Sequence, residues 1–189
     1  MSPVVRIERF ARQATPLRFA VALCAMLAAF LVNAYANADV EALLRGGCGF
    51  LDCLKQLRPE ARHGGYTAAE FRAFLALIEP LRGAALAALL TDLPLAAATT
   101  LALATGAGLA TRGLPLSQRT FRILFLLPLG FLAADLAEDC LLALAYSGLA
   151  DSSLVLPWVS ALKFGLLAAS TMSSLILALA GTALAPPAD

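Results

Sequence analysis

Apolar residues in this chain gather into four long runs, and most polar residues lie between the runs. The runs cover approximately residues 19–36, 83–109, 121–147 and 155–183. Each approaches or exceeds the roughly 20 residues that an α-helix needs to cross the hydrocarbon core of a bilayer. The pattern therefore predicts an all-α fold, an integral membrane four-helix bundle that forms a single domain over residues 1–189.

Residues 37–82 form the longest segment between two runs and contain a helix signal of their own. Thr67 and Glu70 have the spacing of a capping box. The apolar positions that follow at helical spacing are Phe71, Phe74, Leu75 and Ile78. We expect a short amphipathic helix here that packs on the bundle or lies at the membrane interface, rather than one that binds a partner.

The first run permits two interpretations. Basic residues precede it, and Ala36-Asn37-Ala38 fits the A-x-A cleavage site of a signal peptide. The apolar run is slightly long for a signal peptide and its basic leader is long as well, which favours a retained first span.

The distribution of basic residues predicts the orientation. Arginines precede the first run and occupy the linker between the second and third runs, and basic flanks stay in the cytoplasm. These residues are Arg6, Arg9, Arg12, Arg18, Arg112, Arg119 and Arg122. Both termini are therefore predicted to be cytoplasmic and residues 37–82 to be outside. Only two of the fourteen basic residues are Lys, a skew typical of GC-rich bacterial genomes, so we expect a multi-pass protein of the bacterial inner membrane.

Composition agrees with a membrane protein. Of the 189 residues, 60% are hydrophobic and 14% are charged, whereas soluble domains carry about 25% charged residues. The net charge of +1 and the lack of basic clusters interleaved with aromatic residues argue against a nucleic-acid partner. The lipid bilayer is the partner that the composition predicts.

Two cysteines lie in the outer segment. Cys48 and Cys53 either form a disulfide, which an outer compartment permits, or remain two free thiols. Their C-x4-C spacing is not that of a zinc site, and His63 is the only histidine, so no metal site is predicted.

The third run carries three acids on one helix face. Asp135, Glu138 and Asp139 are neighbours at i, i+3 and i+4. Because one carboxylate at bilayer depth costs at least about 2.5 kcal/mol, these acids are expected to face inward, to pair, or to stay protonated.

Two further ionisable residues lie at a similar depth. Asp92 is ten residues from Arg82, about 15 Å along a helix, and Asp139 and Lys163 are each twelve residues from Asp151, about 18 Å. We therefore expect Asp92, Asp135, Glu138, Asp139 and Lys163 to converge. They form either an ion-paired core that fixes helix register or, because four carboxylates exceed one ammonium, a site that holds protons or a cation.

Ser160 and Lys163 have S-x-x-K spacing, which places a hydroxyl and an amine on one helix face. A Ser/Lys nucleophile pair requires that proximity. Small polar residues in membrane helices more commonly serve close helix packing, and the motif is short.

Several short motifs follow one another between residues 66 and 165. They are Tyr66-Thr67-Ala68-Ala69-Glu70, Asp92 with Pro94, Pro128, Asp135-Leu136-Ala137-Glu138 and Lys163. Together they resemble the pattern of a group of small uncharacterised bacterial four-span membrane proteins with Asp-x-x-Glu-Asn in the third span. The chain departs from that pattern with Asp139 in place of the Asn, and with one residue rather than two between Asp92 and Pro94. The resemblance implies the topology and the position of a site, and no activity.

Three functions suit these features. The first is a binding module linked to protons or cations, with an apolar or cationic small ligand. The second is an intramembrane enzyme that modifies a lipid through acid and base carboxylates. The third is a structural or assembly subunit whose charges bind a membrane partner. A carrier role at this chain length requires a homo-oligomer. The sequence indicates no cofactor.

Overall fold

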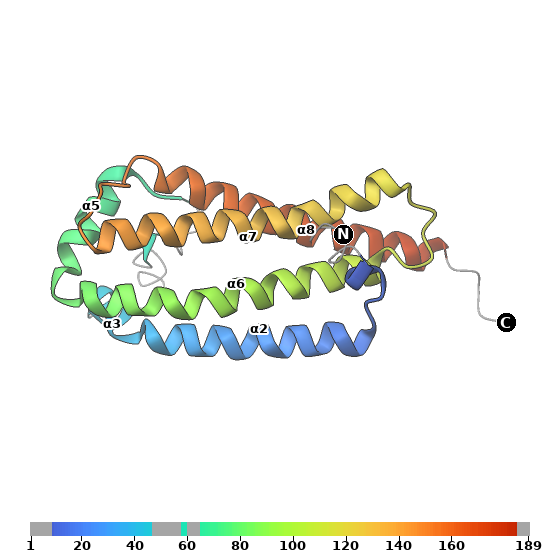
Figure 1. The fold of residues 1–189 in the computed structure, drawn as a ribbon, viewed down its shortest axis with the longest axis horizontal. Coiled ribbons are helices and arrows are strands. Elements are labelled where there is room, and N and C mark those ends of the chain that lie inside the picture. The colour runs from blue at the N-terminus through green and yellow to red at the C-terminus, as the bar shows by residue number, and fades with distance from the viewer. Residues whose placement is uncertain (1–8, 47–57, 60–64, 185–189) are drawn as a thin grey trace.

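Four long helices lie side by side in the computed structural model, which describes residues 9–46, 58–59 and 65–184. They are α2 (Pro16–Ala36), α6 (Arg82–Ala110), α7 (Gln118–Tyr146) and α8 (Leu156–Leu184) (Figure 1). Each is long and apolar enough to cross a membrane. The described ranges contain helices and no strand, which confirms the all-α prediction and places each helix end within about three residues of its expected position.

The second long helix, α6, is the centre of the packing. It contacts α2, α7 and α8, and α7 contacts α8 as well, whereas α2 and α8 hardly touch one another. The buried positions of α6 are mostly small: ten of the eleven are Ala, Gly or Thr, and the other is Leu89. Small side chains let membrane helices approach closely, which explains why three neighbours surround this helix.

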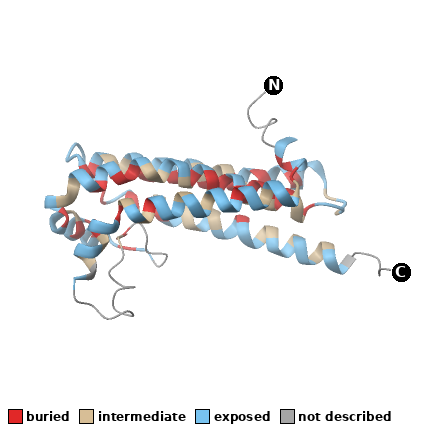
Figure 2. Ribbon diagram, turned by 90° about the horizontal axis from the view of Figure 1, so that it is seen from below, coloured by how far each residue is buried: buried red, intermediate tan, exposed pale blue. Residues whose placement is uncertain are grey.

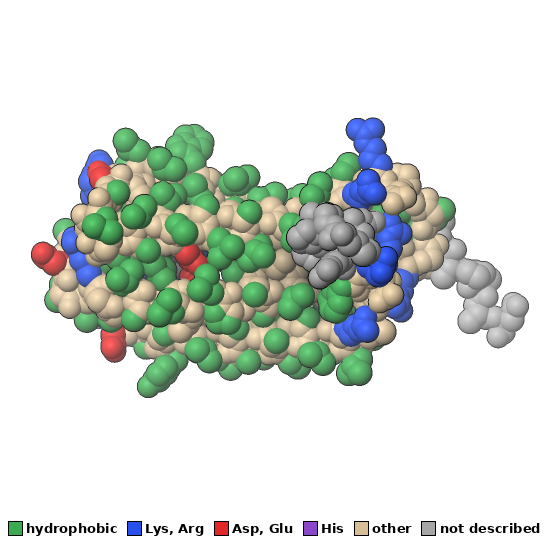
Figure 3. Space-filling model, viewed as in Figure 1, with side chains coloured by type: hydrophobic (Ala, Val, Ile, Leu, Met, Phe, Trp, Pro, Cys, Tyr) green, Lys and Arg blue, Asp and Glu red, His purple; other side chains and the backbone are tan. Residues whose placement is uncertain are grey.

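Burial is concentrated in the two middle helices. Many residues along α6 and α7 are buried, whereas α2 and α8 are mostly exposed (Figure 2). The exposed surface is dominated by hydrophobic side chains along the length of the helices (Figure 3). Water disfavours so large an apolar surface, and a bilayer accommodates it.

One end of the molecule is closed by short helices from the 37–82 segment. These are α3 (Ala38–Arg45), α5 (Ala68–Leu77) and the 3-10 turn η3 (Glu79–Leu81). The predicted capping box is present: the Thr67 hydroxyl accepts from the Glu70 N–H, and the Glu70 carboxylate accepts from the Thr67 N–H at 2.7 Å. Phe71 and Phe74 of α5 are buried in a cluster with residues of α6 and α7. The short helix is therefore packed on the long ones.

The opposite end is held by the segment that precedes α2. Ala11 and Ala14 are buried, and Ala11 packs with residues of α6 and α7. The Arg112 guanidinium donates to the Ala14 carbonyl, and that of Arg12 lies 3.7 Å from the centre of the Phe121 ring. Arg side chains gather at this end of the surface (Figure 3).

The loop between α7 and α8 is tied to α5 through Asp151. Its carboxylate accepts from the Ser153 N–H at 2.9 Å, and the Arg72 guanidinium donates to the Ser153 hydroxyl at 2.9 Å and lies 3.8 Å from Asp151. Hydrogen bonds from Ser153, with a smaller contribution from the charge of Arg72, lower the pKa of Asp151.

A lowered pKa in the folded protein gives this interaction a defined pH dependence. Its stabilising effect is complete above the ordinary pKa of an aspartate and is lost as the pH falls through the lowered value. We expect an NMR titration in micelles to give Asp151 a pKa below the usual range and Ser153→Ala to raise it. An unchanged pKa in Ser153→Ala combined with Arg72→Met contradicts this assignment.

Candidate functional site

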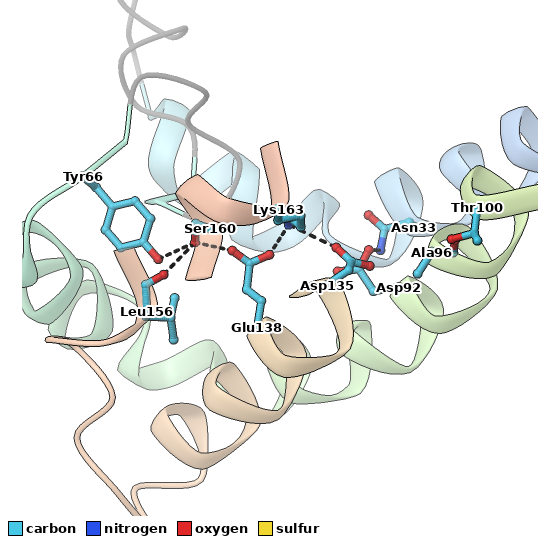
Figure 4. A network of polar contacts seen from close by, with 10 residues as sticks. All are labelled: Asn33, Tyr66, Asp92, Ala96, Thr100, Asp135, Glu138, Leu156, Ser160 and Lys163. Atoms are coloured by element: carbon cyan, nitrogen blue, oxygen red, sulfur yellow. Dashed lines mark hydrogen bonds and ion pairs between the residues drawn. The ribbon is translucent and has the colours of Figure 1, made fainter. Parts of the chain in front are cut away.

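Lys163 is paired with two of the predicted acids. Its ammonium donates to the Glu138 carboxylate and lies 3.2 Å from Oδ1 of Asp135 (Figure 4). The two acids are three residues apart on α7, so they share the face that packs against α8. Glu138 is only 1% exposed, so its charge depends on this pairing.

Ser160 contacts the carboxylate oxygen of Glu138 that Lys163 does not bind. Its hydroxyl contacts Oε1 of Glu138, and also lies 3.0 Å from the Leu156 carbonyl and 3.0 Å from the Tyr66 hydroxyl. Ser160 and Lys163 thus bind the two oxygens of one carboxylate. That arrangement positions Glu138 and leaves the buried serine hydroxyl engaged, which argues against the nucleophile interpretation of the S-x-x-K motif.

Asp92 accepts a hydrogen bond from a side chain of α2. Asn33 of α2 donates through its amide nitrogen to Oδ1 of Asp92 at 3.0 Å and to the Thr91 hydroxyl at 3.1 Å. One turn later, Asn37 donates to the Asn33 carbonyl at 2.9 Å and accepts from the Arg58 guanidinium at 2.7 Å. These contacts attach α2 to α6 by polar bonds in addition to apolar packing.

Asn33 and Arg58 belong to the site, although the sequence had not predicted either of them. An amide inside an otherwise apolar span was the available signal for Asn33, because unpaired polar groups are costly in the bilayer. Nothing comparable marked Arg58, which lies far from the apolar runs in a mixed-charge segment.

A cleft of about 580 Å³ lies among the four long helices and exposes part of this network. Asp92, Asp135, Lys163 and Arg58 contribute its charged groups. Its apolar walls are Met26, Leu27 and Phe30 of α2, Leu95 of α6, Phe131 of α7, and Phe164 and Leu167 of α8. Because α2 and α8 hardly touch, the cleft is not closed by packing between them.

Asp139 lies apart from the pairing around Lys163. It lines a second groove, of about 450 Å³, between α6 and α7, together with Leu90, Leu93 and Cys140. It is 8% exposed, and its Oδ2 has no hydrogen-bond partner. The predicted convergence therefore holds for Asp135 and Glu138 at Lys163 and for Asp92 in the same cleft, whereas Asp139 lines the groove between α6 and α7.

Charge remains unbalanced inside the protein. Among the described residues, this region contains four carboxylates, Asp92, Asp135, Glu138 and Asp139, and two positive groups, Lys163 and Arg58. The sequence had suggested a single amine, and Arg58 adds a second positive group. Counted over the described residues alone, two negative charges are in excess, and a low dielectric favours their neutralisation by protons or by a cation.

In the described part of the chain, no three His, Cys, Asp or Glu side chains are grouped so that they could hold a metal ion. Cys24 and Cys140 are free thiols. Cys48 and Cys53 lie outside the described residues, so their disulfide stays a prediction.

Comparison with known families, characterised proteins and solved structures found no match to this chain.

Proposed function

We propose that this protein is a membrane-embedded binding module whose cleft holds a proton or a cation on Asp92 and Asp135 and receives an apolar or amphiphilic small ligand. The observation that carries the proposal is the cleft itself: two carboxylates from different helices line it beside apolar side chains of α2 and α8. Clefts that are largely apolar with a few placed polar groups are the usual form of small-molecule sites.

The surplus of carboxylates among the described residues supports the proposed binding of a proton or a cation in the cleft. Intramembrane ionisable residues are costly and usually mark ion pathways, proton relays or ligand counter-ions. Lys163 is already engaged by Glu138 and Asp135. Additional positive charge in the cleft, from a proton, a metal cation or a protonated amine, therefore lowers the electrostatic energy of the site.

The lack of close packing between α2 and α8 supports the proposal that the ligand enters the cleft from the lipid. The side chains of Phe30 and Phe164 border the cleft from these two helices, which hardly contact each other. An amphiphile could place its polar group near Asp135 and leave its apolar part between the two helices.

We also propose the orientation in the bacterial inner membrane. The arginine-rich end, which includes Arg12 and Arg112, lies in the cytoplasm under the positive-inside rule. Both termini then lie on the cytoplasmic side, and α3 and α5 on the outer side. An even number of spans, four, returns the chain to the side on which it began, in agreement with this arrangement.

Thermal unfolding in detergent tests the binding proposal. The wild-type midpoint is measured from mildly acidic to mildly alkaline pH, and with sodium chloride against choline chloride at equal ionic strength. A site filled to 100 times its Kd adds about 2.7 kcal/mol to the free energy of unfolding. We expect Asp92→Asn and Asp135→Asn each to remove at least half of the wild-type response to protons or sodium.

The matched control is Glu79→Gln, which neutralises an exposed carboxylate outside the long helices. It should keep the full wild-type response. A full response retained in both Asp92→Asn and Asp135→Asn rejects the proposed site.

A further inference from the structure

A continuous chain of polar contacts joins the outer end of the protein to the cleft. The Tyr66 hydroxyl lies 3.0 Å from Ser160 Oγ, which contacts Oε1 of Glu138. The other Glu138 oxygen accepts from Lys163, whose ammonium lies 3.2 Å from Oδ1 of Asp135 (Figure 4). Three elements supply these groups: the residue before the α5 cap, α7 and α8.

The two ends of this chain reach separate hollows. Tyr66 lines a surface hollow of about 490 Å³ with Glu70 and Trp158. Asp135 and Lys163 line the intramembrane cleft. Between the two, Ser160 and Glu138 are at most 2% exposed.

Apolar packing surrounds the middle of the chain. Phe71, Leu142 and Leu156 are almost fully buried in the cluster that also contains Tyr66. Water is poorly accommodated there, because a buried water needs polar partners as well as space. The side chains themselves are therefore the polar route between hollow and cleft.

We propose that Tyr66, Ser160, Glu138 and Lys163 form a proton path between the outer hollow and Asp135. The proposal rests on the proposed function, because it supplies the protons that the cleft binds. Transfer along a chain requires members that both release and accept a proton. The two hydroxyls do so directly, Glu138 accepts as a carboxylate and donates once protonated, and Lys163 accepts after it has released one of its protons.

One inward transfer balances as follows. A proton from water in the hollow binds the Tyr66 oxygen as the Tyr66 proton moves to Ser160, and the Ser160 proton moves to Glu138. Lys163 donates one of its protons to Asp135 and takes the proton from Glu138. One proton has left the hollow, Asp135 is neutral, and Lys163 is again an ammonium; rotation of the two hydroxyls restores the chain.

Charges on neighbouring elements act on this transfer. Asp92 lies on α6, Asp139 lies on α7, and the Arg58 side chain lines the cleft. The carboxylates favour arrival of a proton at Asp135, and Arg58 opposes it. These groups set how many protons the cleft holds, whereas the hydroxyls of Tyr66 and Ser160 set how fast the protons arrive.

The test is a rapid pH step on the full-length protein in detergent, followed by the infrared carbonyl band of protonated carboxylic acids. Tyr66→Phe and Ser160→Ala each delete one hydroxyl, and the space left is smaller than the roughly 30 Å³ that a water molecule occupies in the liquid. A positioned proton donor contributes about a hundredfold or more to a transfer rate, so we expect a slowing of about that size. The final amplitude of the band should stay at the wild-type level.

Three matched variants separate a proton path from a structural role. Ser170→Ala removes another buried α8 hydroxyl, and Tyr35→Phe removes an exposed phenol; both should keep the wild-type rate. Ser160→Thr keeps a hydroxyl at this position and should retain most of the wild-type rate. If Ser160→Ala does not fold, Tyr66→Phe and Ser160→Thr decide the question.

The outcomes for the path and for the proposed function differ. Wild-type rates in folded Tyr66→Phe and Ser160→Ala, with a normal amplitude, overturn the path and leave proton binding intact. A band whose amplitude is the same in wild type, Asp92→Asn and Asp135→Asn counts against proton binding in the cleft. That result rejects the proposed function and the proton path together.

Discussion

Replacing Lys163 by Met is expected to lower the free energy of unfolding by about 3–5 kcal/mol, the cost of removing one partner from a buried ion pair. The substitution leaves Glu138 and Asp135 without the ammonium that both contact. Met fills much of the same space, so lost packing contributes little. Thermal or denaturant unfolding in detergent measures the effect.

An exposed ion pair provides the matched control. Arg72 lies 3.8 Å from Asp151, and both side chains are more than half exposed. Exposed pairs contribute at most about 1 kcal/mol, so Arg72→Met should have a much smaller effect than Lys163→Met.

A double substitution tests the cause. Adding Glu138→Gln to Lys163→Met removes the most buried of the uncompensated charges, and coupling between residues in direct contact reaches about 0.5–3 kcal/mol. We therefore expect the double variant to be more stable than the sum of the two single effects predicts. Strictly additive effects contradict an energetic link between the two residues.

Gly108→Ala is expected to destabilise the protein by about 1–3 kcal/mol, as overpacking of a tight contact does. A Cβ at this position of α6 collides with the backbone carbonyl of Ala11 and lies 3.3 Å from the Ala14 Cβ. A backbone segment has few ways to yield, so the segment before α2 must move away from α6. Faster tryptic cleavage at Arg12, together with a lower unfolding midpoint, is the expected result.

Two other glycines supply graded controls. A Cβ at Gly106 approaches only the Phe19 side chain, at 3.2 Å, and Gly165 of α8 has nothing within 4 Å. Gly106→Ala should have an intermediate effect. Gly165→Ala should be neutral or stabilise by about 0.5–1 kcal/mol, because alanine suits a helix interior better than glycine. Equal effects at all three positions contradict close packing at Gly108.

The four long helices and their approximate ends follow from the sequence alone, whereas the short helix α3 was not predicted. Apolar runs of this length leave the backbone no alternative in a bilayer but to bond within each segment, so the helices are determined locally. The capping box at Thr67 and Glu70 is equally local and is confirmed. Asp135 and Glu138 could be placed on one face because helical periodicity fixes neighbours three residues apart.

Tertiary structure alone decided which of these groups meet. Depth along a helix is readable from residue counts, but the neighbour that each position meets depends on packing. Asp139 therefore shares the predicted level of Lys163 and yet lines the groove between α6 and α7. The partnership of Asn33 with Asp92 and the approach of Arg58 join segments far apart in the chain. Contacts of that kind arise from the fit of side chains between whole helices, for which a single sequence carries no local signal.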